Sequence, residues 1–125
     1  MNLLINKTAT EGAYVVHVEG ELDVYTAPML KDALSEGMVR GHKLMVVDLT
    51  RVPFLDSTAL GVLVGSLHRL RSDEGDLRLV LSSPHLAKLF RITGFDGMFS
   101  IHETVPDALA DPLEQDVPAA GGPAT

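Results

Sequence analysis

The 125-residue chain carries 17 acidic against 10 basic residues, for a net charge of −7, and it contains no cysteine. These values exclude disulfides, thiolate zinc sites and a cysteine nucleophile, and they disfavour nucleic acids and anionic membranes, which repel an acidic chain without a basic stripe. No apolar run approaches the ~18 residues of a membrane-spanning helix, and no signal peptide is recognisable at the N-terminus, so we expect a cytoplasmic protein.

Two strands are expected first. Residues 3–7 form a short strand, and residues 13–20 form a β-branched one that ends at a glycine. A polar turn separates the two, which favours an antiparallel pair. Residues 21–25 then follow as a loop or a brief strand.

A helix is expected next, over about residues 27–40. Thr26 offers an N-cap, and Pro28 lies in the first turn, where its missing N–H costs nothing. Apolar residues repeat at helical spacing as far as Met38, and Gly41 ends the helix.

The following strand, residues 44–49, is nearly all apolar, which is typical of a strand that helices cover on both faces. Residues 50–55 lead out of it as a loop, because Pro53 cannot sit in a central ladder. A second helix then begins at Asp56 or Ser57. Its predicted inner stripe consists of Leu60, Leu63, Val64, Leu67 and Leu70.

The rest of the chain repeats this alternation. We expect a buried strand over residues 77–82, a short helix over 84–92, a last strand near 98–101 and a terminal helix over about 105–110. From residue 112 the composition turns to Pro, Gly and Ala with little to bury, so residues 112–125 are predicted to be a disordered tail.

This order of elements, β-β-α-β-α-β-α-β-α, predicts the fold class. It indicates an α/β protein with a mixed, mostly parallel central sheet of four to five strands, about four helices and an N-terminal antiparallel hairpin.

Few residues offer catalytic or metal chemistry. The five histidines share no ligand spacing, no phosphate-binding glycine loop is present, and Ser57 does not lie in a Gly-x-Ser-x-Gly elbow. Gly61 and Gly65 lie four apart in the second helix, which favours close packing of the sheet or of a partner over a ligand site. We therefore expect no metal and no cofactor in this chain.

Ser57 is the most informative residue. It follows a buried strand at the start of a helix, where functional groups gather in open α/β sheets. One reading is an ordinary helix cap, since Asp, Ser and Thr are the standard caps. However, Asp56, Ser57 and Thr58 supply more capping oxygens than one helix needs. A helix N-terminus also favours a phosphate, which would change the docking surface by about −1.5 to −2 charges without unfolding the helix.

Three stretches carry a family resemblance: residues 20–28 (GELDVYTAP), residues 46–63 (VVDLTRVPFLDSTALGVL) and residues 89–96 (LFRITGFD). Together they resemble the anti-sigma factor antagonists of the STAS domain class, and the middle stretch resembles the phosphoacceptor motif of that family. The similarity covers residues 1 to about 110, so we expect a STAS domain over residues 1–111.

The resemblance implies a regulator and not an enzyme. Such proteins bind an anti-sigma factor, typically also a serine kinase, and thereby free a sigma factor that controls processes such as stress response or sporulation. The kinase phosphorylates the serine after the motif's aspartate, which is Ser57 here, and the phosphorylated antagonist dissociates from the anti-sigma factor. A metal-dependent serine phosphatase resets the switch. ATP and magnesium would belong to the kinase, and we expect this chain to be a monomer.

The resemblance has one departure, in the residues after Ser57. The family often has a second serine or threonine and then glycine, whereas this chain has Thr58 and Ala59. Thr58 is thus a competing acceptor, although the motif position favours Ser57. The expected partner-binding residues are Glu21, Asp23, Tyr25, Thr26, Asp56, Thr58, Leu60 and Gly61.

Two alternatives remain open on the sequence alone. The chain could be a STAS scaffold or sensor module in a larger signalling complex that binds a small nucleotide or a lipid. It could also be a small hydrolase that uses Ser57, although no base is tied to this serine in the sequence.

Overall fold

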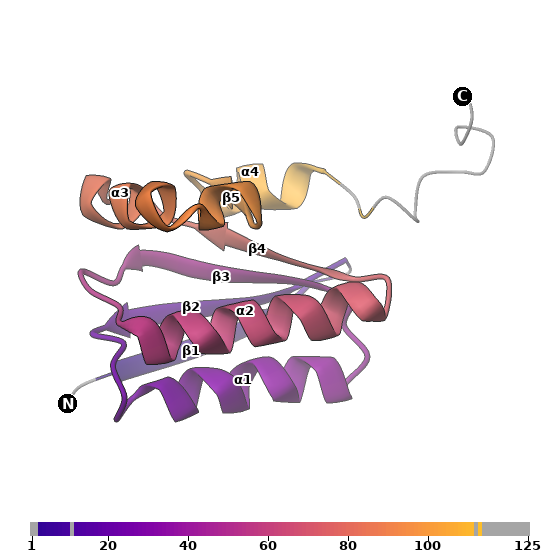
Figure 1. Cartoon of the computed structure of the whole chain (residues 1–125). Helices are drawn as coiled ribbons and strands as arrows, with labels where there is room; N and C mark the ends of the chain where they lie inside the picture. The colour runs from indigo at the N-terminus through magenta and orange to yellow at the C-terminus, as the bar shows by residue number, and fades with distance from the viewer. Residues whose placement is uncertain (1–2, 11, 112, 114–125) are drawn as a thin grey trace.

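The computed structural model describes residues 3–10, 12–111 and 113, and within them a five-stranded mixed sheet (Figure 1). The strand order is β1-β2-β3-β4-β5; the first pair is antiparallel and the other three are parallel. The strands are β1 (Leu3–Ala9), β2 (Tyr14–Gly20), β3 (Leu44–Arg51), β4 (Asp76–Val80) and β5 (Ser100–His102).

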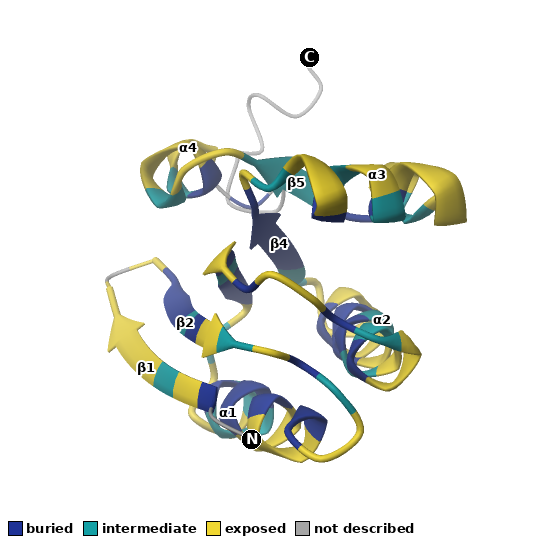
Figure 2. Ribbon diagram, turned by 90° about the vertical axis from the view of Figure 1, so that its left-hand side faces the viewer, coloured by how far each residue is buried: buried dark blue, intermediate teal, exposed yellow. Residues whose placement is uncertain are grey.

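The described residues also form four helices and one 3-10 turn. They are α1 (Ala27–Val39), α2 (Ser57–Ser72), α3 (Pro84–Thr93), the 3-10 turn η1 (Phe95–Gly97) and α4 (Val105–Ala110). Figure 2 shows α4 on one side of β4, with α2 and α3 on the other. Within the described part of the chain, no helix has the length and apolar character needed to cross a membrane.

Both faces of β3 are buried, as its apolar run predicts. Val47 belongs to the main core, where it joins Leu63 of α2. Val46 belongs to a smaller core on the opposite face, together with Val80 and Ala108 of α4. The predicted fold class is therefore confirmed, including the antiparallel N-terminal pair.

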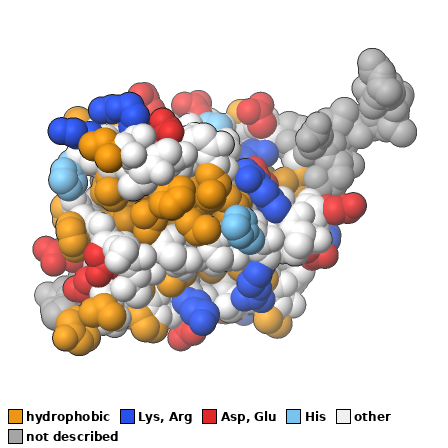
Figure 3. Space-filling view, viewed as in Figure 1, with side chains coloured by type: hydrophobic (Ala, Val, Ile, Leu, Met, Phe, Trp, Pro, Cys, Tyr) orange, Lys and Arg blue, Asp and Glu red, His pale blue; other side chains and the backbone are white. Residues whose placement is uncertain are grey.

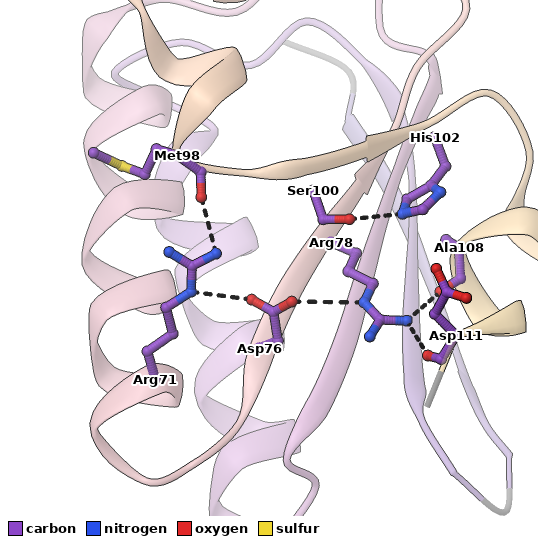
Figure 4. A network of polar contacts seen from close by, with 8 residues as sticks. All are labelled: Arg71, Asp76, Arg78, Met98, Ser100, His102, Ala108 and Asp111. Carbon is purple, nitrogen blue, oxygen red and sulfur yellow. Dashed lines mark hydrogen bonds and ion pairs between the residues drawn. The ribbon is translucent and has the colours of Figure 1, made fainter. Parts of the chain in front are cut away.

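A buried arginine fastens α4 to the sheet (Figure 4). Arg78 is 6% exposed, and its Nη1 donates to the carbonyl of Ala108 at 2.7 Å and to that of Asp111. Its Nε lies 3.6 Å from the carboxylate of Asp76, which also pairs with Arg71 at 3.2 Å. Because α4 has only six residues, the carbonyls at its C-terminal end lack N–H donors within the helix, and Arg78 supplies donors to the carbonyls of Ala108 and of the C-cap residue Asp111.

The buried stripe of α2 differs from the predicted one. Leu60 and Val64 are half-buried, because α2 is rotated so that smaller side chains face the interior. The buried residues of α2 are Ala59, Leu63, Ser66, Leu67 and Leu70.

The predicted disordered tail, residues 112–125, lies outside the described residues except for Leu113. This side chain is buried against Ala13 and Leu44 and therefore belongs with the folded part.

Candidate functional site

Two loops lie side by side beyond the ends of β2 and β3. We call residues 21–26 and 52–56 the paired loops. An isolated parallel bridge joins Leu22 to Leu55, with the Leu22 N–H donating to Phe54 and the Asp56 N–H donating to Leu22, each at 3.0 Å. Both leucines are buried, so the loops share a fixed geometry. Figure 1 shows α1 and α2 starting at this same edge of the sheet.

The first loop is held by its own polar side chains. Asp23 Oδ1 accepts from the N–H groups of Tyr25 (2.9 Å) and Thr26 (3.0 Å), and the Thr26 hydroxyl lies 2.8 Å from the Glu21 carbonyl. Desolvation alone would raise the pKa of Asp23, but the hydrogen bonds from Thr26 and Tyr25 outweigh it and lower that pKa. The loop is thus a preformed turn in which Asp23 is ionised at neutral pH.

Thr26 does not cap α1 as the sequence suggested. It occupies the N-cap position, yet its side chain makes no capping bond. Its hydroxyl instead accepts from the N–H of Asp23 at 2.9 Å, inside the loop.

Asp56, and not Ser57, caps α2. Its side chain accepts from the N–H of Ala59 at 3.1 Å, and its backbone adopts the extended conformation of an N-cap. Ser57 is the first residue of the helix and is exposed. Its hydroxyl has no hydrogen-bond partner among the described residues, and the same holds for Thr58. The ordinary-cap reading of Ser57 is therefore wrong, and its hydroxyl is available to other molecules.

Hydrogen bonds near the C-terminal end of β3 stabilise the backbone that leads into the second loop. Asp48 Oδ2 lies 2.9 Å from His17 Nδ1, and Asp48 Oδ1 accepts from the N–H (3.0 Å) and hydroxyl (2.7 Å) of Thr50. Desolvation raises the pKa of Asp48, but the bonds from Thr50 and His17 outweigh it and lower that pKa. His17 thus has a structural partner, and no cluster of three or more metal-ligating side chains occurs in the described ranges.

The predicted contact residues fall into two groups. Four of them, Glu21, Tyr25, Thr58 and Gly61, are exposed at this edge, and Leu60 beside them is half-buried. The other three, Asp23, Thr26 and Asp56, use their side chains inside the loops.

Thr26 is only 3% exposed, and its role in partner binding stays a prediction. Its effect on any partner acts through the shape of the loop.

The sequence predicted Tyr25 at this edge but not the exposed apolar side chains that accompany it. Val24, Met29 and Phe54 are 45–54% exposed, and all lie on the paired loops or in the first turn of α1. Figure 3 shows hydrophobic side chains exposed at the lower left, on the side where α1 begins. Solvent-exposed apolar side chains gathered at one edge are typical of protein contact surfaces. Phe54 could have indicated this apolar surface in the sequence, because it is an aromatic residue next to Pro53 in a predicted loop, outside any helix or strand pattern.

Two glycines on α2 have no role inside the fold. A Cβ added at Gly61 or Gly65 would meet no atom within 4 Å. By contrast, a Cβ at Gly37 would lie 2.6 Å from both Met45 and Tyr14, so that glycine is required by packing. A helical glycine costs about 0.5–1 kcal/mol relative to alanine. The close packing on the sheet expected for Gly61 and Gly65 is therefore wrong, and packing against a partner stays a prediction.

Comparisons with known proteins agree with this geometry. The STAS domain family model matches residues 5–108. The anti-sigma-B factor antagonist of Staphylococcus aureus (strain NCTC 8325 / PS 47) is 38% identical over 103 residues, which cover 82% of this chain and 95% of that protein. The crystal structure of an anti-sigma factor antagonist from Mycobacterium paratuberculosis has a TM-score of 0.80 at 30% identity, over 87% of this chain and 92% of the other.

A third likeness concerns the fold alone. The Bacillus cell fate determinant SpoIIAA, solved in its phosphorylated form, matches with a TM-score of 0.67 at 23% identity, over 87% of this chain and 97% of the other.

This chain belongs to the STAS domain family, and within it to the anti-sigma factor antagonists. Proteins of this class are non-enzymatic regulators, which sets aside the hydrolase alternative. The geometry agrees, because no base within the described part of the chain hydrogen bonds to Ser57.

Proposed function

We propose that this antagonist is switched by phosphorylation of Ser57. In the unphosphorylated state it binds an anti-sigma factor that is also a serine kinase, and a sigma factor is released. Once Ser57 carries a phosphate, the complex dissociates and the sigma factor is captured again.

The observation that carries this proposal is that Asp56 caps α2 while the adjacent Ser57 does not. Asp56 satisfies the free N–H of Ala59 at the start of α2, while the hydroxyl of Ser57 is exposed and without a partner in the described structure. A phosphate on Ser57 therefore breaks no internal bond. The N-terminus of α2 also favours the added negative charge.

Dissociation follows from charge and bulk. A phosphate adds about −1.5 to −2 charges beside Asp56, on an edge that also carries Glu21. Since the Leu22–Leu55 bridge fixes both loops, the partner meets a changed surface on an unchanged frame. The likeness of this fold to phosphorylated SpoIIAA supports a STAS fold that tolerates such a group.

The rest of the cycle lies outside this chain. A metal-dependent serine phosphatase, with manganese or magnesium, removes the phosphate, and ATP with magnesium is held by the kinase. We also propose that the protein is a cytoplasmic monomer, which is the default for a single domain of this size.

The test uses the full chain with each candidate anti-sigma kinase of the source organism, purified separately. Intact mass spectrometry after incubation with ATP and magnesium is expected to show one added phosphate, located at Ser57 by fragmentation. Ser57→Ala abolishes it, while the matched variant Thr58→Ala keeps it.

A pull-down completes the test. Ser57→Ala is expected to retain the kinase and Ser57→Asp to lose it. If Thr58 alone takes up the phosphate, the acceptor is misassigned; if neither residue does, the switch does not exist. A large stable assembly in light scattering would instead favour the scaffold alternative.

A further inference from the structure

A groove runs between α1 and α2, beginning beside the proposed acceptor. It encloses about 330 Å³. It starts at Thr58, next to Ser57, and continues along α2 to Arg69, about 16 Å further at the helical rise. The lining residues are Lys31, Thr58, Gly61, Val62, Gly65, Ser66 and Arg69.

The charge of this groove is opposite to that of the protein. The chain has a net charge of −7, yet the groove is lined by two basic residues and no acidic one. Six of the ten lysines and arginines have an acidic partner in an ion pair. Lys31 and Arg69, like Lys88 and Arg91 on α3, form no ion pair among the described residues, so no carboxylate of the described chain neutralises the two cations of the groove.

The shape of the groove points the same way. An added Cβ at Gly61 or Gly65 would contact no atom of the protein within 4 Å, so the small size of these residues keeps this space open without serving the fold. Val62 contributes an apolar side chain to the lining, together with the two cations. A peptide segment that binds in the groove therefore contacts an apolar surface with one positive charge from each helix.

We propose that the groove between α1 and α2 binds an acidic segment of the kinase that phosphorylates Ser57, a proposal that rests on the function proposed above. Charge complementarity selects the occupant, because carboxylates on that segment pair with Lys31 and Arg69 while a small apolar side chain lies over the glycines. Contact here is continuous with contact at Ser57 but does not touch the reacting hydroxyl. The groove thus contributes to binding the kinase and leaves the chemical step unchanged.

The test measures initial rates of Ser57 phosphorylation by the cognate kinase at varied concentrations of the full chain. The double variant Lys31→Glu with Arg69→Glu is expected to raise KM at least about tenfold with kcat within about twofold, since lost binding that is equal in the ground and transition states changes KM alone. The matched control, Lys88→Glu with Arg91→Glu on α3, makes the same change in net charge outside the groove and is expected to leave KM within about twofold.

A second variant tests the groove without altering charge. Gly65→Leu fills the space over α2 and is expected to raise KM by a similar factor, while thermal unfolding shows that all variants remain folded. Three outcomes would overturn the groove assignment while Ser57 phosphorylation of the wild type stands. They are an unchanged KM in both groove variants, an equal rise of KM in the α3 control, and a fall in kcat instead of a rise in KM. Absence of phosphorylation in the wild type itself would overturn the switch and the groove together.

Discussion

The side chains of Arg78 and Ser57 differ in how far the protein itself satisfies their hydrogen-bonding groups. Arg78 is buried and bound to Asp76 and to two carbonyls at the end of α4. Ser57 is exposed, and no described residue accepts or donates a hydrogen bond at its hydroxyl. One region uses polar chemistry to hold elements together, and the other leaves it for another molecule.

The comparison teaches that stability and function are separable along this chain. Groups that complete internal bonds away from the paired loops should cost stability when removed and leave phosphorylation unchanged. Groups without internal bonds should show the reverse. Variants ranked by their effect on the free energy of unfolding therefore test the division directly.

The largest loss of stability is expected for Arg78→Leu. It removes the donor to the carbonyls of Ala108 and Asp111 in a buried place, and the free energy of unfolding should fall by about 3 kcal/mol. Urea unfolding measures it. Arg71→Leu, which removes a half-exposed partner of Asp76, should cost less than about 1 kcal/mol. Equal costs for both arginines would mean that the buried network does not hold α4.

A smaller loss is expected for Asp56→Ala. The N–H of Ala59 loses its acceptor, and removal of such a cap costs about 1 kcal/mol. Asp56→Asn should retain most of the stability, because an amide oxygen also accepts this bond. Thermal and urea unfolding of the two variants give the comparison, and indistinguishable values would show that Asp56 is not the cap.

Gly65→Ala should raise stability by about 0.5–1 kcal/mol. The new methyl group meets no atom within 4 Å, and alanine favours the helix. Gly37→Ala is the control with the opposite sign, since its Cβ would collide with Met45 and Tyr14. A destabilised Gly65→Ala protein would show that the outer face of α2 is not open.

Asp48 lies between the two extremes, because it is satisfied by neighbours yet partly faces solvent. Its pKa is lowered in the folded state. The stability that it contributes is therefore present above its unfolded pKa of about 3.9 and is lost as pH falls through the lower folded value. Unfolding measured from pH 6 to pH 3 should decline less steeply in Asp48→Asn than in the wild type. Parallel profiles would contradict the assignment.

The smallest effect on stability is expected for Ser57→Ala. The hydroxyl makes no bond to any described residue, so the free energy of unfolding should change by less than about 0.5 kcal/mol. Calorimetry of Ser57→Ala beside Asp56→Ala checks this. A loss as large as that of Asp56→Ala would mean that the serine carries part of the cap.

Local patterns predicted the frame of this protein. The apolar run in β3 predicts a strand covered on both faces, and Val46 and Val47 lie in opposite cores. The residues that follow the strand predict a helix beginning at Asp56 or Ser57, and α2 begins at Ser57.

Features that depend on contacts between distant segments were not predictable. The bridge joins Leu22 to Leu55, 33 positions apart in the sequence, and no local pattern in either loop predicts it. The rotation of α2 that buries Ala59 and Ser66, and leaves Leu60 and Val64 half-buried, is set by packing against the sheet and α1. The burial of Arg78 could not be predicted from its position in a strand, because its partners are carbonyls of α4, which lies far away in the sequence.

The assignment of the α2 cap to Asp56 has a consequence for how such a switch evolves. Because Asp56 secures the start of the helix, residue 57 can be exchanged without loss of the cap. If Ser57 is the acceptor proposed above, selection could alter kinase recognition at this position after gene duplication, and duplicated antagonists could become specific for different kinases on the same scaffold.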